Sequence, residues 1–461
     1  MSIVYAVCVP HPPLIIPEVG KGEQKGIQRT INSYEAVMKK AASFQPELVI
    51  ITSPHATTYL DYFHISSGSH AQGNFGQFRA PHVVIEAAYD EKFIHELSQH
   101  CAKKGFSAGT TGERNPELDH ATMIPLYFLR HYTTDFKVVR IGISGLSALA
   151  HYQFGQVIQE TVESLGRKTV FIASGDLSHK LKKDGPYGYA KEGPAFDQEI
   201  TEAFSKGDFL KFMTFSPVFC DKAAECGLRS FIIMAGALDR TKVASTLYSY
   251  EGPFGVGYGV AEFFPEGLDA SRNIGDIYEA KMLQKAAESK ANEDPYVHLA
   301  RETITRFIKH LPPVTDLSSY PKEMWDRKAG VFVSLHEEGQ LRGCIGTFKP
   351  TTACIAKEIM QNAVSACFED PRFPAVEEYE LDRLVYSVDV LGKTEPVKDR
   401  KTLDPRRYGV IVSCGTRRGL LLPNLEGVDT VAEQIEIARR KGGISEEEPV
   451  TLQRFEVVRH L

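Results

Sequence analysis

The sequence lacks the features that mark several common classes of protein. Its 8 cysteines form no CxxC pair, so zinc fingers and iron–sulfur clusters are not indicated. No stretch approaches the roughly 20 apolar residues of a membrane span. Residues 1–16 have no basic region and are interrupted by prolines, unlike a signal peptide. We therefore expect a cytoplasmic chain with reduced thiols.

The sequence also lacks an excess of basic charge. A formal net charge of -6 predicts neither nucleic acid nor an anionic membrane as a partner. With 43% hydrophobic and 24% charged residues, the composition is that of an ordinary globular protein. A length of 461 residues and the absence of internal repeats predict two or more different domains. We expect a small-molecule ligand, and the sequence does not decide whether the chain forms a homo-oligomer.

Near-continuous apolar runs alternate with helical patterns in the first half of the chain. The expected strands are Ile3–Val9, Glu47–Ser53, Val83–Tyr89, Phe136–Ser144, Thr169–Asp176 and a closing strand at Val256–Phe264. The expected helices are Gly26–Ala42, Glu91–Lys104, Tyr152–Leu165 and Ala195–Phe212. Continuous apolar runs favour strands that are covered on both faces. This predicts an α/β domain over residues 1–265, with a mostly parallel central sheet and helices on both faces.

Histidines follow three of these expected strands. His11 lies between prolines after the first strand, His55 follows Pro54 after the second, and His179 follows the glycine-containing turn after Thr169–Asp176. Ligands bind at the carboxyl ends of strands in such sheets. Any one of these residues is more often a simple loop histidine, but three at corresponding positions indicate a functional site.

A carboxylate would complete a metal site with two of these histidines. Non-haem Fe(II) sites commonly use two imidazoles and one carboxylate, which leave positions open for substrate and O2. Glu225 precedes an apolar helical stretch, and Asp221 competes for the same role. Alternatively, an acid at that position only stabilises the helix N-terminus. The hypothesis is that His11, His55 and Glu225 bind Fe(II).

Two further histidines are candidate catalytic residues. His179 can act as a general acid–base near neutral pH. His120 follows Asp119, which could orient the ring, and precedes the apolar run Met123–Leu129. A hydrogen bond at a helix start is the alternative for His120. Tyr59, Tyr62, Phe63 and Phe75 could line a pocket, although such residues are more often core.

These motifs, taken in order, resemble those of a known enzyme family. The segments are Pro10-His11-Pro12, Pro54-His55, Asp119-His120-Ala-Thr-Met, Gly175-Asp176-Leu177-Ser178-His179 and Glu225-Cys226-Gly227. Over residues 1–265 they resemble the LigB-type class III extradiol dioxygenases and their relative, the Memo family. The resemblance implies Fe(II) on His11, His55 and Glu225, acid–base chemistry by His179, and substrate contact by His120. Glu225 favours the dioxygenase, whereas Cys226 is similar to the Memo cysteine.

A second domain is expected after a linker with a bridging helix at residues 266–294. Over residues 295–461 the predicted helices are Val297–Lys309, Thr352–Cys367 and Val431–Lys441. The predicted strands are a hairpin over Val331–Gly346, then Leu384–Leu391, Tyr408–Gly415, Arg418–Pro423 and Thr451–Val458. Antiparallel hairpins mixed with helices predict a separate α+β domain.

The most distinctive motif of this second domain is Leu341-Arg342-Gly343-Cys344-Ile345-Gly346. Cys344 could be a nucleophile or a metal ligand if Arg342 supplied a cation and His336 a base. The alternative is a small cysteine buried in a tight sheet. With Ala366–Pro374, Tyr386–Leu391 and Gly419–Pro423, the motif resembles the AMMECR-type domain family.

The resemblances leave three functions open. The first is an Fe(II)-dependent oxygenase acting on a catecholic or related substrate. The second is a metal- or ligand-binding module without ring cleavage, because AMMECR-type and Memo-type domains resemble two parts of a system whose third member is a radical SAM protein. The third is a zinc hydrolase using the same residues, and the absence of an HExxH helix disfavours only its metalloprotease form.

Overall fold

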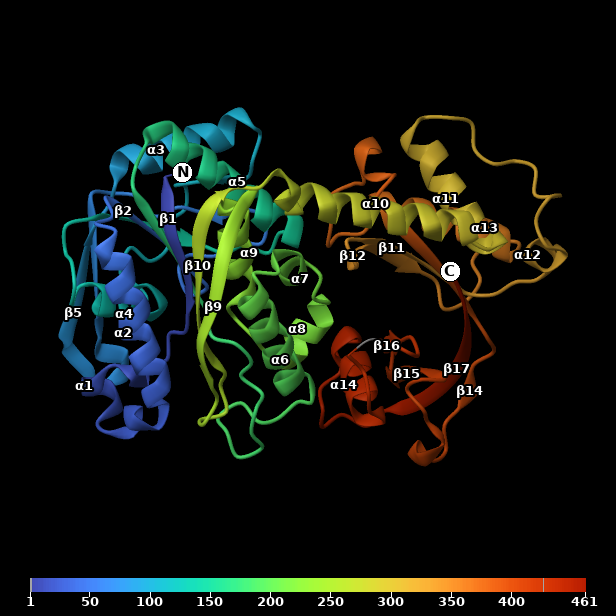
Figure 1. Cartoon of the computed structure of the whole chain (residues 1–461). Coiled ribbons are helices and arrows are strands. Elements are labelled where there is room, and N and C mark those ends of the chain that lie inside the picture. Colours follow the sequence, from blue (N-terminus) through green and yellow to red (C-terminus); the bar gives the residue numbers. More distant parts are fainter. Residues whose placement is uncertain (1, 426) are drawn as a thin grey trace. The chain divides into compact units, whose positions relative to one another are not determined.

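The computed structural model describes residues 2–425 and 427–461 and divides the chain into two compact units, Met1–Glu279 and Ala280–Leu461 (Figure 1). The boundary falls within helix α10 (Ile274–Asn292), which occupies the expected linker. None of the described helices is long and apolar enough to cross a membrane.

A six-stranded sheet forms the centre of the first unit, in the order β7-β2-β8-β1-β10-β9. The strands are β1 (Ile3–Val9), β2 (Leu48–Ser53), β7 (Lys137–Gly142), β8 (Thr169–Ser174), β9 (Thr241–Glu251) and β10 (Tyr258–Leu268). Strands β7, β2, β8 and β1 pair in parallel. These four strands are almost completely buried, which explains their continuous apolar runs.

The sheet is mixed, so the expectation of a mostly parallel sheet is not confirmed beyond its four parallel strands. Strand β10 pairs antiparallel with both β1 and β9, so the β9–β10 hairpin adds two antiparallel strands. Along β9, buried and exposed positions alternate, so the sequence has no continuous apolar run there and no strand was expected. The expected strand Val83–Tyr89 forms but lies outside the main sheet, because β5 (Ala80–Ala88) pairs with β4 (His70–Phe75). A short parallel pair joins β3 (Phe63–His64) to β6 (Ala108–Gly109).

Helices cover both faces of the six-stranded sheet (Figure 1). Helices α2 (Gln28–Ser43) and α4 (His120–Leu129) lie on one face, and α5 (Ala148–Leu165), α6 (Glu192–Lys206) and α9 (Leu228–Ala237) lie on the other. The remaining helices of this unit are α1 (Pro17–Gly20), α3 (Glu91–Lys103), α7 (Phe209–Met213) and α8 (Pro217–Ala223). The single helix expected at Ala195–Phe212 is divided into α6 and α7 because Gly207 adopts a left-handed conformation (φ 62°).

The second unit is built on an antiparallel sheet in the order β12-β11-β13-β17-β15-β16, with β14 paired to β17. Its strands are β11 (Val331–Glu337), β12 (Gln340–Gly346), β13 (Val385–Leu391), β14 (Glu395–Pro396), β15 (Tyr408–Cys414), β16 (Arg417–Leu421) and β17 (Thr451–His460). Glu338 and Gly339 both have positive φ, so they form the tight turn expected between β11 and β12.

Two groups of helices pack on different parts of this sheet. Helices α11 (Pro295–Ile308) and α13 (Ile355–Phe368) pack on β11, β12 and β13, and α12 (Lys322–Asp326) packs on α13. Helix α14 (Val431–Lys441) packs on β15 and β16 and begins at a capping box of Thr430 and Glu433. Each region has its own apolar core.

Candidate metal centre

The carboxyl ends of three adjacent parallel strands form the base of the candidate site. Strand β8 pairs with β1 on one side and β2 on the other, and Val9 lies opposite Ser174. His11 follows β1, His55 follows β2, and Asp176 follows β8. Because the strands run in the same direction, the three loops emerge at one edge of the sheet.

The buried His11 ring is held by the loop that follows β8. The His11 backbone N–H donates to Asp176 Oδ1 at 2.7 Å, and the ring Nδ1 lies 3.1 Å from Ser174 Oγ. Pro10 and Pro12 restrict the backbone on both sides of His11. These contacts direct Nε2 away from the sheet and leave it available to a ligand.

Three potential metal ligands converge on this Nε2 atom. His55 Nε2 lies 3.2 Å from His11 Nε2, and Cys226 Sγ lies 3.6 Å from it. The ligand atoms of His11, His55 and Cys226 all lie within 4.8 Å of one another. Burial lowers the pKa of His11 well below its usual range and also lowers the pKa of His55. Both imidazoles are therefore neutral near pH 7, the form that binds metal.

The Glu225 carboxylate is not part of this group. Its Oε2 accepts a hydrogen bond at 2.7 Å from the Leu228 backbone N–H, in the first turn of α9. Burial raises the pKa of Glu225 to about 7. Glu225 therefore has the helix-start role that the sequence left as its alternative, and the structure places Cys226 beside the two histidines instead.

Two glycines bring the cysteine loop against the loop after β8. A Cβ atom on Gly175 would lie 2.1 Å from Gly227 Cα, so the two backbones touch where neither residue has a side chain. The Asp176 backbone N–H donates to Cys226 Sγ at 3.3 Å, and the Gly227 N–H donates to the Asp176 carbonyl at 3.1 Å. This close approach fixes the sulfur next to His11.

His120 and His179 lie around the same group. The His120 ring centroid lies 4.4 Å from that of His55 and 5.3 Å from that of His11. Burial lowers the pKa of His120 to about 4 and also lowers the pKa of His179. The His179 ring packs edge-on against Tyr187 at 5.0 Å. Both rings are neutral near pH 7, so each can accept or donate one hydrogen bond at a bound molecule.

A polar network fixes the start of the helix that carries His120. Asp119 caps α4 by accepting from the Thr122 backbone N–H at 3.0 Å, and it also accepts from Ser53 Oγ at 2.6 Å. The buried Arg140 guanidinium donates to the Glu117 and Asn115 carbonyls of the preceding segment. Asp119 thereby connects His120 to the end of β2, two residues before His55.

Two family models match this chain, one in each unit. The family model described as the catalytic LigB subunit of aromatic ring-opening dioxygenase matches residues 5–261. The chain belongs to the LigB family. A second family model, AMMECR1, matches residues 297–460, so a LigB domain is fused to an AMMECR1 domain.

Some relatives of this LigB-family chain match its whole length, and others match only part of it. Protein CA_C1420 of Clostridium acetobutylicum is 41% identical and covers 100% of this chain and 99% of its own length. A Thermotoga maritima protein is 49% identical and covers 36% of this chain and 98% of its own length. The crystal structure of uncharacterized protein JW3007 from Escherichia coli K12 covers 56% of this chain and 99% of its own, with 12% identity and a TM-score of 0.36.

In the AMMECR1 domain, the expected partners of Cys344 are only partly in place. Arg342 is turned away, since its Nε donates to Glu380 Oε1 at 2.7 Å and its Nη1 donates to the Pro374 carbonyl at 2.9 Å. The cations that act on Cys344 are instead Arg372 and Lys441, but burial dominates and raises the pKa of its thiol. Cys344 is therefore protonated near pH 7, which disfavours the nucleophile hypothesis.

Three of the aromatic residues that the sequence offered as pocket lining in the LigB domain make other contacts. Phe63 and Phe75 are fully buried in the core, and the Tyr59 hydroxyl donates to the Gly112 carbonyl. The sequence offered Cys226 only as a secondary candidate, because nothing local distinguishes it from Glu225 beside it. The cations Arg372 and Lys441 were missed because they lie far from Cys344 along the chain.

Proposed function

We propose that the LigB domain is an Fe(II)-dependent oxidoreductase that opens the ring of a catecholic or related small substrate with O2. One observation carries this proposal: His11, His55 and Cys226 bring two imidazoles and one sulfur to a single point, at the strand ends of a LigB fold. The Fe(II) would be held by these three residues, with Cys226 in the place that the sequence gave to Glu225.

The spacing of the three ligand atoms fits one bound metal ion. Imidazole nitrogens and thiolate sulfurs bind such ions at about 2.0–2.3 Å. Two ligand atoms on one ion then lie about 3–3.8 Å apart. The observed separations from His11 Nε2, 3.2 Å to His55 Nε2 and 3.6 Å to Cys226 Sγ, fall in this range. At this distance two neutral imidazoles can share one proton in an N–H···N hydrogen bond or direct both nitrogen lone pairs at one cation.

The residues around the ligands suit the chemistry of an aromatic diol. Fe(II) bound there would supply the Lewis acidity and the electrons that O2 chemistry requires. His179 is neutral, so it can accept the proton that a substrate hydroxyl loses on binding. His120 can donate a hydrogen bond to a substrate oxygen from the fixed start of α4. Burial of His11 limits the access of water to one side of the group.

A second candidate function is a metal-binding module without ring-cleavage activity that serves a radical SAM partner. The observation that favours it is Cys226, because a thiolate replaces the carboxylate of the usual Fe(II) triad. Thiolate ligands also suit zinc, which does not activate O2. Metal identity and oxygen consumption therefore separate the two candidates.

Metal content tests the ligand assignment. The full chain, purified without oxygen and loaded with Fe(II), is expected to hold one iron per chain, and His55→Ala and Cys226→Ala to lose most of it. Glu225→Gln is the matched control, because the amide oxygen can still accept from the Leu228 N–H. Iron retained by Cys226→Ala but lost from Glu225→Gln would restore the carboxylate as the third ligand and overturn our assignment.

Oxygen consumption tests the reaction. The iron-loaded chain is expected to consume O2 with at least one member of a panel of catechols, and the His179→Gln variant to retain iron but turn over more slowly. Iron binding that matches the ligand assignment, without turnover of any diol, would favour the second candidate. Full activity with zinc in place of iron would contradict both oxygen chemistry and this proposal.

A further inference from the structure

The AMMECR1 domain contains a cavity that the proposed function of the LigB domain does not use. Its volume is about 560 Å³, within the range of sites for small organic molecules. Apolar side chains from different parts of the domain line it, including Phe332, Leu341, Leu420, Leu422 and Leu425. Such a wall favours the apolar body of a small molecule over a free inorganic ion.

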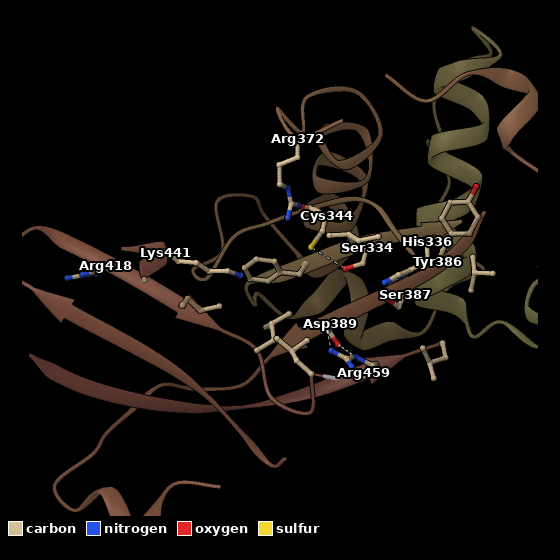
Figure 2. A pocket seen from close by; sticks show the side chains of 18 residues that line it. Ser334, His336, Cys344, Arg372, Tyr386, Ser387, Asp389, Arg418, Lys441 and Arg459 are labelled. Carbon is tan, nitrogen blue, oxygen red and sulfur yellow. Dashed lines mark hydrogen bonds and ion pairs between the residues drawn. The ribbon is translucent and has the colours of Figure 1, made fainter. Parts of the chain in front are cut away.

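A row of small polar side chains crosses the wall formed by three adjacent strands. Ser334 on β11 is in register with Cys344 on β12 and with Ser387 on β13. Its hydroxyl donates to Cys344 Sγ at 3.2 Å (Figure 2). The alternate residues of β11, including Val333 and Leu335, are buried in the core with α11 and α13. The cavity therefore lies on the sheet face opposite these helices.

Of the four cations that line this cavity, exposed Arg418 and Lys441 have no carboxylate partner among the described residues. Arg372 is paired with Asp370, and Arg459 with Asp389, each through two hydrogen bonds. Lys441, in the last turn of α14, pairs with no carboxylate in the described part of the chain. Figure 2 shows its side chain extending toward Cys344 and Ser334, and its charge acts on the Cys344 thiol.

We propose that this cavity binds an apolar or aromatic organic acid. The body of the acid lies against the leucines and Phe332, its anionic group pairs with Lys441, and it covers the Cys344 thiol. Lys441 is available to an anion because it has no carboxylate partner among the described residues, whereas Arg372 and Arg459 are already paired. The proposal is independent of the metal centre, since every residue in it belongs to the AMMECR1 domain.

Binding of a fluorescent probe tests the proposal on the full chain. 8-Anilinonaphthalene-1-sulfonate combines an aromatic body with one anionic group and should bind saturably. Lys441→Gln should weaken that binding about tenfold, the change expected for loss of one charge-assisted contact. Lys398→Gln is the control, because this exposed lysine lies outside the cavity. Equal binding by native, Lys441→Gln and Lys398→Gln chains would overturn the role of Lys441.

Protection of Cys344 from alkylation locates the probe. Saturating probe should slow the modification of Cys344 by iodoacetamide, followed by the mass of its peptide, and leave Cys414 unaffected. Both cysteines are half-buried in the same domain, so Cys414 reports any general effect of the probe. Protection of neither cysteine, or of both equally, would place the probe elsewhere and refute the site. This measurement uses the native chain and does not depend on whether a variant folds.

Displacement of the probe tests the chemical class. 2-Naphthoate should displace it, and 2-naphthalenemethanol, which has the same rings without the charge, should need at least about ten times the concentration. Inorganic phosphate alone should not compete at equal ionic strength. Equal potency of the acid and the alcohol would show an apolar site without anion recognition, and competition by phosphate alone would show an anion site without an apolar component. Either result contradicts the proposal.

Discussion

Substitution of Gly175 by alanine tests whether the glycine contact positions Cys226. The added Cβ would lie 2.1 Å from Gly227 Cα and 3.1 Å from the Gly227 N and C atoms. Carbon atoms normally approach to about 3.5–4 Å, so one backbone segment must move by more than about 1 Å. Because both neighbours are backbone, no flexible side chain can absorb the shift.

The expected result has two parts. Forced overpacking of this kind costs about 1–3 kcal/mol, and we expect the upper half of that range for the LigB domain. Movement of Gly227 also carries Cys226 away from His11 Nε2, now 3.6 Å away. Loss of positioning around a metal ligand typically lowers metal affinity about 10–100-fold. We expect that loss for Fe(II) and for Co(II).

The assay is a competitive titration of Co(II) against a chromophoric chelator without oxygen. Sulfur-to-cobalt absorption in the near ultraviolet should report the Cys226 ligand and weaken in Gly175→Ala. Stability is measured by circular dichroism or calorimetry, because the only tryptophan, Trp325, lies in the second unit and does not report on the first. About 2 kcal/mol should lower the transition by roughly 3–4 °C for a domain of this size.

Gly185→Ala is the matched control in the same unit. Its Cβ would meet the Lys182 carbonyl oxygen at 3.2 Å and Gly255 Cα at 3.4 Å, contacts that a small adjustment relieves. This variant should keep native stability and Co(II) affinity. If Gly175→Ala behaved like the control, the glycine contact would not position the sulfur. A loss of stability with unchanged affinity and absorption would limit Gly175 to a packing role.

Three further predictions concern other parts of the chain. Burial raises the pKa of Asp197 to about 7, so the folded LigB domain holds a proton there that the unfolded chain loses above about pH 4, and its stability falls as pH rises from about 4 to 7. In urea titrations at pH 5 and 7, Asp197→Asn should reduce this fall by roughly 1 kcal/mol per pH unit, and an equal fall in the native chain and the variant would refute the prediction. Arg140→Met should lower the free energy of unfolding by about 3–5 kcal/mol and make the segment around Asn115 and Glu117 accessible to limited proteolysis. An unchanged cleavage pattern would contradict the role of Arg140 in ordering this segment. Thr430→Ala should destabilise α14 by about 1 kcal/mol, seen in thermal unfolding followed by Trp325, whereas Thr430→Ser should not.

The parallel half of the LigB sheet is predictable from the sequence because burial on both faces leaves continuous apolar runs. Strands β1, β2, β7 and β8 each lie within one residue or two of their expected bounds. The β9–β10 hairpin is less visible, since β9 alternates between buried and exposed positions. Apolar content alone also cannot assign β5 to a sheet, because pairing with β4 depends on contacts far outside the local window.

The second domain is predictable for a different reason, since its elements carry strong local signals. The turn at Glu338 and Gly339 requires positive φ at two positions, and glycine supplies one of them. Helix α14 begins after Thr430 with Glu433 three residues later, a capping box that the sequence shows directly. The cavity, by contrast, joins Cys344 to Lys441 across nearly a hundred residues, so no local pattern reveals it.

The proposed third ligand, Cys226, shows most clearly what the sequence alone could not predict in the candidate site. Glu225 and Cys226 are adjacent, so a one-residue difference in the path of the chain exchanges their environments. Ala224 ends α8 in a left-handed conformation (φ 52°), an uncommon state for a residue with a side chain. Directly after this turn, the Glu225 carboxylate meets the free backbone N–H of Leu228, and Cys226 meets His11.

This arrangement follows from the helix start as much as from the metal ligands. The first turn of α9 has unpaired N–H groups, and Gly227 at its cap position has no side chain to accept from them. Glu225 supplies that acceptor, and turning it toward the helix leaves the next residue facing the histidines. In a chain where Gly227 were serine or aspartate, the cap would be satisfied locally and Glu225 would be free to turn toward the metal. A Cβ atom on Gly227 would lie 2.4 Å from Cζ of the Phe231 ring and 2.9 Å from Gly175 Cα, so the packing around Gly227 excludes such a side chain and leaves Glu225 as the acceptor at the helix start.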